Sequence, residues 1–179
     1  MKVKQSTKSL ELEQIDLNNV KRINFFKRDG LTFNVIDKGP IDGEVAVLLH
    51  GFPQRASSWS NVMKELNKAG YRTIAPDQRG YSPEARPKGR YAYRVSELAM
   101  DVVELIKQLI TGPVHLVGHD WGSFVGWTVA GKYPKFIKTW TSVSLPHPKA
   151  FVRSLFLSKQ SFHSWYMLFF SYLLYLNSY

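Results

Sequence analysis

Cysteine is absent from this 179-residue chain, and aspartate and glutamate are absent after position 120. The lack of cysteine excludes disulfide bonds and thiol chemistry and is compatible with a reducing cytoplasm, so we expect a cytoplasmic location. The charged N-terminus precedes no apolar core, and therefore does not indicate a secretory signal. The aromatic stretch from Trp165 to Leu176 is shorter than the roughly 20 apolar residues that cross a bilayer. We expect no transmembrane segment.

Positive charge exceeds negative charge, with 24 Lys and Arg against 14 Asp and Glu and a formal net charge of +10. The cations are spread along the chain, with a modest cluster at Lys21, Arg22, Lys27 and Arg28, and no basic recognition motif accompanies them. We therefore predict a solvated basic surface and no nucleic-acid partner. A hydrophobic fraction of 44% argues against a disordered chain.

The stretch Gly118-His119-Asp120-Trp121-Gly122 has the spacing of a nucleophile elbow, with aspartate at the position where serine is usual. It lies between an apolar run, 113–117, that predicts a buried strand and a segment, 121–132, that predicts a helix. Such a sharp turn leaves little room for a Cβ atom at its two glycines. A carboxylate with a reference pKa near 3.9 is ionised at neutral pH, so Asp120 is suited to attack a saturated carbon. The alternative is a glycine-rich connection with an incidental aspartate.

A second motif, His50-Gly51-Phe52-Pro53, directly follows the apolar, strand-like run Val45–Leu49. Its position fits an oxyanion hole, in which one backbone N–H comes from the residue after the nucleophile and another from the loop after an earlier strand. Trp121 and Phe52 are the candidate donors. The alternative is a turn that merely ends a strand, and for His50 we expect a structural hydrogen-bonding role.

Strands and helices alternate along the chain, which predicts an α/β fold with a mostly parallel sheet and helices on both faces. Strands are expected at 31–36, 44–49, 71–75, 113–117 and 139–145, and helices at 57–69, from 96 onward and at 121–132. The side chains expected to face the core are Trp59, Val62, Met63 and Leu66 in the first helix, Leu98, Val102, Leu105, Ile106 and Leu109 in the second, and Phe124, Val125 and Val129 in the third.

The two motifs together resemble the α/β-hydrolase family, and more narrowly its epoxide hydrolases and haloalkane dehalogenases, which use an aspartate nucleophile. The likeness runs from about Leu31 to Phe170. Its further pieces are Ala75-Pro76-Asp77-Gln78-Arg79-Gly80-Tyr81 and Ser144-Leu145-Pro146-His147-Pro148. The resemblance implies structural roles for Asp77 and Arg79, in an ion pair or in loop contacts.

The resemblance also implies a mechanism in two halves, acting on a small-molecule substrate, an epoxide, without a metal or organic cofactor. Asp120 attacks an epoxide carbon while Tyr166, in the cap-like segment Ser164–Phe170, and a second cap tyrosine protonate the oxygen. Water then attacks the resulting ester, with a histidine base oriented by a carboxylate. Side-chain packing is the alternative role for Tyr166.

Phe52 occupies the position where many dehalogenases carry a halide-binding side-chain amide, which favours an epoxide over a haloalkane. The indole N–H of Trp121 could still bind a halide, so a haloalkane dehalogenase-like hydrolase is kept as an alternative.

The catalytic triad of this fold runs nucleophile, acid, histidine, yet residues 121–179 contain no acid. His147 and His163 follow the nucleophile, but neither lies after a last core strand. Both are expected to be structural or solvent-facing. The chain is therefore expected to be inactive in multiple turnover by itself.

The sequence after Phe170 also departs from the resemblance, which would continue with a Gln and a Pro-containing turn. We expect a C-terminally truncated family member, incomplete at its C-terminus. Residues 1–148 would form the N-terminal part of the core and 149–179 the start of a helical cap. The alternative function is a non-catalytic remnant, whose uncovered sheet edge makes self-association possible.

Overall fold

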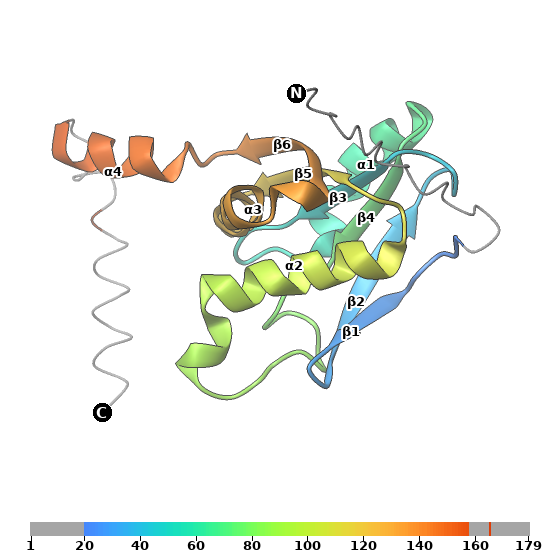
Figure 1. The fold of residues 1–179 in the computed structure, drawn as a ribbon, viewed down its shortest axis with the longest axis horizontal. Helices are drawn as coiled ribbons and strands as arrows, with labels where there is room; N and C mark the ends of the chain where they lie inside the picture. Colours follow the sequence, from blue (N-terminus) through green and yellow to red (C-terminus); the bar gives the residue numbers. More distant parts are fainter. Residues whose placement is uncertain (1–19, 158–164, 166–179) are drawn as a thin grey trace, which may run out of the picture.

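The computed structural model describes residues 20–157 and Trp165, and it contains one six-stranded sheet with the strand order β1-β2-β4-β3-β5-β6 (Figure 1). The predictions for His163 and Tyr166 lie outside the described residues. The strands are β1 (Phe25–Arg28), β2 (Leu31–Lys38), β3 (Val45–Leu49), β4 (Arg72–Pro76), β5 (Val114–His119) and β6 (Ile137–Val143).

Strands β3, β4, β5 and β6 pair in parallel, whereas β1 with β2 and β2 with β4 pair antiparallel. The predicted mostly parallel sheet is confirmed. Strand β1 was not predicted, although Asp29-Gly30 is a hairpin signal, and both residues have positive φ angles, 49° and 76°. The last strand begins at Ile137, two residues earlier than predicted, because Val114 at the start of β5 pairs with it.

The helices are α1 (Ser60–Lys68), α2 (Val95–Leu109), α3 (Trp121–Lys132) and α4 (Pro148–Leu157), with short 3-10 turns η2 (Ala56–Trp59), η3 (Arg90–Tyr93) and η4 (Pro134–Phe136). In Figure 1, α2 and α3 lie side by side on one face of the sheet, and α4 projects away from it. Within the described residues, no helix combines the length and hydropathy needed to span a membrane.

Alternate residues of β3 face two separate cores, as expected when successive strand side chains point to opposite faces. Val45, Val47 and Leu49 pack with the apolar residues of α2 and α3. Ala46 and Leu48 pack with those of η2 and α1. The prediction of helices on both faces is therefore confirmed.

The predicted helix 121–132 matches α3 at both ends. Among the side chains predicted to face the core, Leu66 and Leu98 are half-buried and two are exposed. Val62 is 43% exposed, because the buried stripe at this end of the fold follows Trp59 and Met63 and leaves Val62 beside it. Phe124 is 39% exposed, because it lies about 100° around α3 from the buried Val125, and its ring packs edge-to-face on the Trp121 ring with 5.8 Å between centroids.

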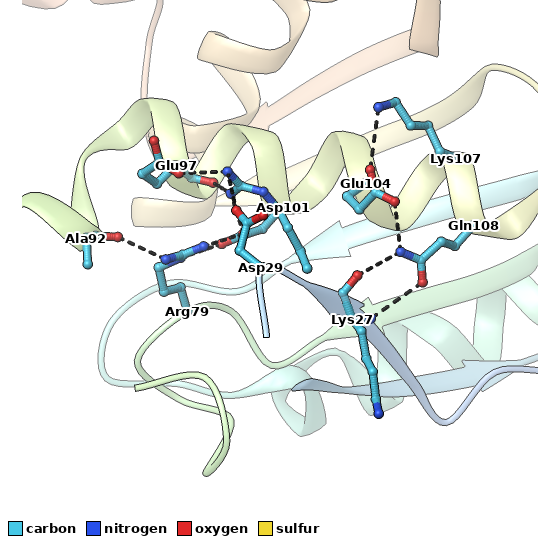
Figure 2. A network of polar contacts seen from close by, with 10 residues as sticks. Lys27, Asp29, Arg79, Ala92, Glu97, Asp101, Glu104, Lys107 and Gln108 are labelled. Carbon is cyan, nitrogen blue, oxygen red and sulfur yellow. Dashed lines mark hydrogen bonds and ion pairs between the residues drawn. The ribbon is translucent and has the colours of Figure 1, made fainter. Parts of the chain in front are cut away.

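A network of charged groups, buried at Arg79 and Asp101, ties α2 to β1 and to the loop after β4 (Figure 2). The Arg79 guanidinium donates two hydrogen bonds to the Asp101 carboxylate, both at 2.7 Å. Arg28 donates to Asp101 and to the Glu97 carboxylate, also at 2.7 Å each. Arg79 also donates to the carbonyl of Ala92 in η3 at 3.2 Å, so this network positions the loop beside the carboxyl ends of the strands.

Asp77 and Arg79 do not form an ion pair with each other. Asp77 accepts a hydrogen bond from the Arg55 guanidinium at 2.8 Å and another from the Ala56 N–H at 2.8 Å. Both residues are buried and hold loops, so their roles are structural and their partners come from other segments.

Candidate active site

Asp120 lies at the turn between β5 and α3, half-buried, with φ 52° and ψ −119°. Its own N–H donates to the Val143 carbonyl at 3.2 Å, and its carbonyl accepts from the Ser123 N–H at 2.9 Å. A non-glycine residue in such a sparsely populated conformation costs about 1–3 kcal/mol and persists only where its surroundings enforce it. The strained turn places the carboxylate at the carboxyl end of the parallel strands.

Three glycines allow the close approach of backbone segments around Asp120. A Cβ atom on Gly118 would lie 2.6 Å from the carbonyl oxygen of Gly122, and one on Gly51 would lie 2.7 Å from Asp120 Oδ1. A Cβ atom on Gly122 would lie 2.8 Å from the carbonyl oxygen of His50. Any side chain at these positions would therefore push the strand, the elbow or the loop after β3 apart.

The loop after β3 touches the carboxylate directly, because the backbone N–H of Phe52 donates to Asp120 Oδ1 at 2.9 Å. Phe52 is 70% exposed, and its contact with the Asp120 carboxylate is made by its backbone N–H. The next residue, Pro53, follows a cis peptide bond. His119 Nδ1 lies 3.2 Å from Gln54 Oε1, a second link between this loop and the end of β5 that the sequence did not predict.

Trp121 occupies the first position of α3, and its side chain is 55% exposed. Backbone N–H groups in the first turn of a helix have no partner within the helix, and the positive end of the helix dipole favours a negative charge nearby. The N–H groups of Phe52 and Trp121 thus come from the two segments that flank the Asp120 carboxylate.

His50 is buried, and both of its ring nitrogens have partners. Nε2 accepts a hydrogen bond from the Gln78 N–H at 3.1 Å, so the proton is on Nδ1, which donates to the Gly51 carbonyl at 2.9 Å. Burial lowers the pKa of the His50 imidazole and keeps it neutral. The residue holds the loop after β3 against the loop after β4.

Tyr81 is a residue of the site that the sequence did not single out. Its ring packs edge-to-face on His50 with 4.6 Å between ring centroids. Burial, and then the negative charge of Asp120, raises the pKa of the Tyr81 phenol. It therefore stays protonated at neutral pH, within electrostatic reach of the carboxylate. The only signal in the sequence was its place at the end of the segment 75–81.

The remaining described histidines lie in two other places. His115 Nε2 lies 2.8 Å from Glu44 Oε2 and its Nδ1 lies 2.8 Å from Thr139 Oγ1, at the start of β5. Asp120 follows the end of that strand, five residues further on and thus about 17 Å away. His147 is exposed and packs on the Trp127 ring at 4.8 Å. Among the residues that the structure describes, no group of His, Asp and Glu is arranged to hold a metal ion.

Comparison with known proteins gives consistent matches. The model of the alpha/beta hydrolase fold family matches residues 45–172. The AB hydrolase superfamily protein YfhM of Bacillus subtilis is 40% identical over 127 residues, which is 71% of this chain and 44% of that protein. Epoxide hydrolase 2 of Caenorhabditis elegans is 34% identical over 144 residues, which is 80% of this chain and 40% of that protein.

Two solved structures of epoxide hydrolases are also similar to this chain. The epoxide hydrolase of Bacillus megaterium has a TM-score of 0.76 and 34% identity, over 82% of this chain and 51% of that one. Epoxide hydrolase VrEH1 of Vigna radiata has a TM-score of 0.65 and 38% identity, over 70% of this chain and 42% of that one. The chain spans less than half the length of the curated relatives it matches.

Proposed function

The chain belongs to the alpha/beta-hydrolase family, and we propose that its Asp120 opens the ring of an epoxide substrate and forms an ester with it. One observation carries the proposal: the carboxylate lies at a strained elbow and accepts a hydrogen bond from the backbone N–H of Phe52. Relatives that are named epoxide hydrolases support the choice of an epoxide as the substrate.

The geometry distinguishes the two carboxylate oxygens of Asp120. Oδ1 accepts the Phe52 hydrogen bond, whereas Oδ2 has no hydrogen bond from the described residues and is the oxygen that attacks. As the new O–C bond forms, the ring C–O bond breaks and the ring oxygen takes up a proton. We assign that proton to the phenol of Tyr166, together with a second tyrosine of a cap.

Hydrolysis of the ester is the second half of the reaction. The N–H groups of Phe52 and Trp121 would stabilise the tetrahedral oxyanion, and one such donor contributes about 2.7–4 kcal/mol to the transition state. Residues 121–179 contain no Asp or Glu to orient a histidine base. The His115–Glu44 contact lies at the opposite end of β5. We therefore propose that this chain alone captures its substrate but does not turn over.

The proposal extends to the organisation of the chain. Residues 1–148 form part of the hydrolase core, and 149–179 begin a helical cap. The position of α4, away from the sheet in Figure 1, supports this division. The exposed edge strand β6, paired only with β5 among the described strands, is the surface through which the chain would self-associate.

Intact-mass spectrometry after incubation with styrene oxide tests the function. We expect one covalent adduct that maps to Asp120 and is absent from Asp120→Asn, a substitution that keeps the shape and tolerates the positive φ angle. Asp42→Asn, which changes an exposed carboxylate at the opposite end of β3, is the matched control and should label normally. Undiminished labelling of Asp120→Asn contradicts the assignment of the nucleophile. Steady multiple-turnover formation of diol contradicts the proposal for the second half.

A further inference from the structure

A cavity of about 220 Å³ lies beside the starts of β3 and β5, at the end of the sheet opposite to Asp120. A single water molecule needs only about 10–15 Å³, so the cavity has room for a small organic molecule. Part of its wall is apolar and comes from Ile41, Val45 and Pro113. None of the described residues that contact Asp120 lines this cavity, here called the basal cavity. It is therefore a separate site.

The polar wall of the basal cavity is fixed by contacts that join three strands. Glu44 Oε2 lies 2.8 Å from His115 Nε2 on β5, and Glu44 Oε1 accepts a hydrogen bond from the ammonium of Lys138 on β6. The other ring nitrogen of His115 lies 2.8 Å from Thr139 Oγ1, and the Tyr71 ring packs edge-to-face on the imidazole with 5.5 Å between centroids. The wall is thus held in place by the protein itself.

The lining of the basal cavity carries more negative than positive charge. Hydrogen bonds from Lys138 and then from His115 lower the pKa of the Glu44 carboxyl, so Glu44 is ionised at neutral pH. The ammonium of Lys138 therefore offsets this one carboxylate. A second carboxylate on the lining, that of Asp42, is exposed and forms no ion pair with the described residues. The cavity consequently favours a cation.

A buried hydroxyl on the same lining has no partner. Thr111 Oγ1 is buried and makes no hydrogen bond with the described residues. Buried polar atoms are nearly always hydrogen-bonded, because an unpaired one has lost its bonds to water. A hydroxyl oxygen can accept a hydrogen bond from an ammonium group. Thr111 is therefore an indication, independent of the charges, that a polar group of a ligand enters the cavity.

The cation that fits is organic, because among the residues that the structure describes no group of His, Asp and Glu is arranged to hold a metal ion. We propose that the basal cavity binds a small protonated amine, whose ammonium group pairs with Asp42 and whose apolar part packs on Ile41 and Pro113. This site does not depend on the epoxide-opening function, since it shares no residue with the surroundings of Asp120.

Phenethylamine and the neutral phenethyl alcohol, which is of similar size, test the proposal. Each is titrated into the isotope-labelled full-length chain at about pH 8, where an ordinary imidazole is neutral. NMR shifts of the backbone amides of Glu44, Val45 and His115 report binding at the cavity. We expect saturable shifts with the amine at millimolar concentrations and weaker binding of the alcohol, because only the amine carries a charge that pairs with a carboxylate.

Three variants test the role of each polar group on the lining. Asp42→Asn should weaken amine binding by about 2- to 5-fold, the range expected for an exposed ion pair. Thr111→Val keeps the side-chain shape and should also weaken binding, because it removes the unpaired hydroxyl. Lys138→Gln should tighten binding, because it removes the opposing positive charge. A general loss of structure cannot move the affinity in both directions.

Glu84→Gln is the matched control, because it removes an exposed carboxylate that does not line the basal cavity, and it should leave amine binding unchanged. Equal effects of Asp42→Asn and Glu84→Gln would overturn the proposal. So would equal affinities for the amine and the alcohol, or the absence of saturable shifts at the three amides.

Discussion

Replacing Gly122 with alanine should disrupt the site through the backbone alone. A Cβ atom there would lie 2.6 Å from the carbonyl carbon and still nearer to the carbonyl oxygen of Leu49, and 2.8 Å from the carbonyl oxygen of His50. Real Cβ atoms essentially never approach closer than 3.0 Å, so α3 and the end of β3 must separate by at least 0.4 Å. Overpacking of this kind costs about 1–3 kcal/mol. Because Phe52 follows directly after the displaced segment, its N–H should also move away from the Asp120 carboxylate.

The matched control is Gly131→Ala in the same helix, where a Cβ atom would meet nothing within 4 Å. It should stabilise the chain by about 0.5–1 kcal/mol, because alanine is the better helix former. Urea denaturation measures both free energies of unfolding, and the epoxide-labelling rate of Asp120 measures the effect on the site. We expect Gly122→Ala to unfold at lower urea and to label more slowly, by as much as about 100-fold for a misplacement near 1 Å. Equal stability of the two variants would refute the packing argument.

Three further predictions follow from the buried charges and the loop after β3. Asp101→Leu leaves two arginines without their shared carboxylate and should lower the free energy of unfolding, measured in urea, by about 3–5 kcal/mol. Glu65→Ala removes an exposed ion pair and should change that free energy by less than about 1 kcal/mol. Similar losses in the two variants would contradict the structural role of the network. Burial lowers the pKa of the His50 imidazole below its usual 6.5, so the unfolded chain binds a proton that the native chain does not. Stability should therefore fall as pH drops below 6.5, by up to about 1.4 kcal/mol per pH unit, and the slope should be shallower in His50→Gln. Parallel slopes in the two proteins would show that His50 does not titrate this way. Phe52→Ala should label with epoxide as fast as the parent chain, because the group that contacts Asp120 is the backbone N–H, and a large loss of rate would assign that role to the aromatic side chain.

The local structure of the elbow could be predicted from the sequence, because its causes are local. The helix from Trp121 to Lys132 was predicted at both ends. The two glycines flanking Asp120 are required by close backbone contacts within a few residues of the turn and with the strand beside it. Apolar runs likewise indicated the parallel strands, since a strand buried on both faces contains little else.

The partners of charged and aromatic side chains could not be predicted, because they depend on which segments the sheet brings together. The pairing of Leu49 with Gly118 in adjacent parallel strands is what places the Phe52 N–H against a carboxylate 68 residues away. Arg79 pairs with the carboxylate of Asp101 on α2 and not with Asp77. Periodicity wrongly predicted Phe124 to face the core, because neighbouring positions on a helix differ by only about 100° and the edge of the buried face is not marked in the sequence.

The sequence by itself determined that a carboxylate would stand at a tight strand-to-helix turn, since that follows from residue types and spacing within one short segment. Only the tertiary structure decided what surrounds it: the donor on Oδ1 and the protonated Tyr81 phenol. These come from segments distant in sequence, and their approach is fixed by strand register and by the packing of α2 on the sheet, which no local pattern encodes.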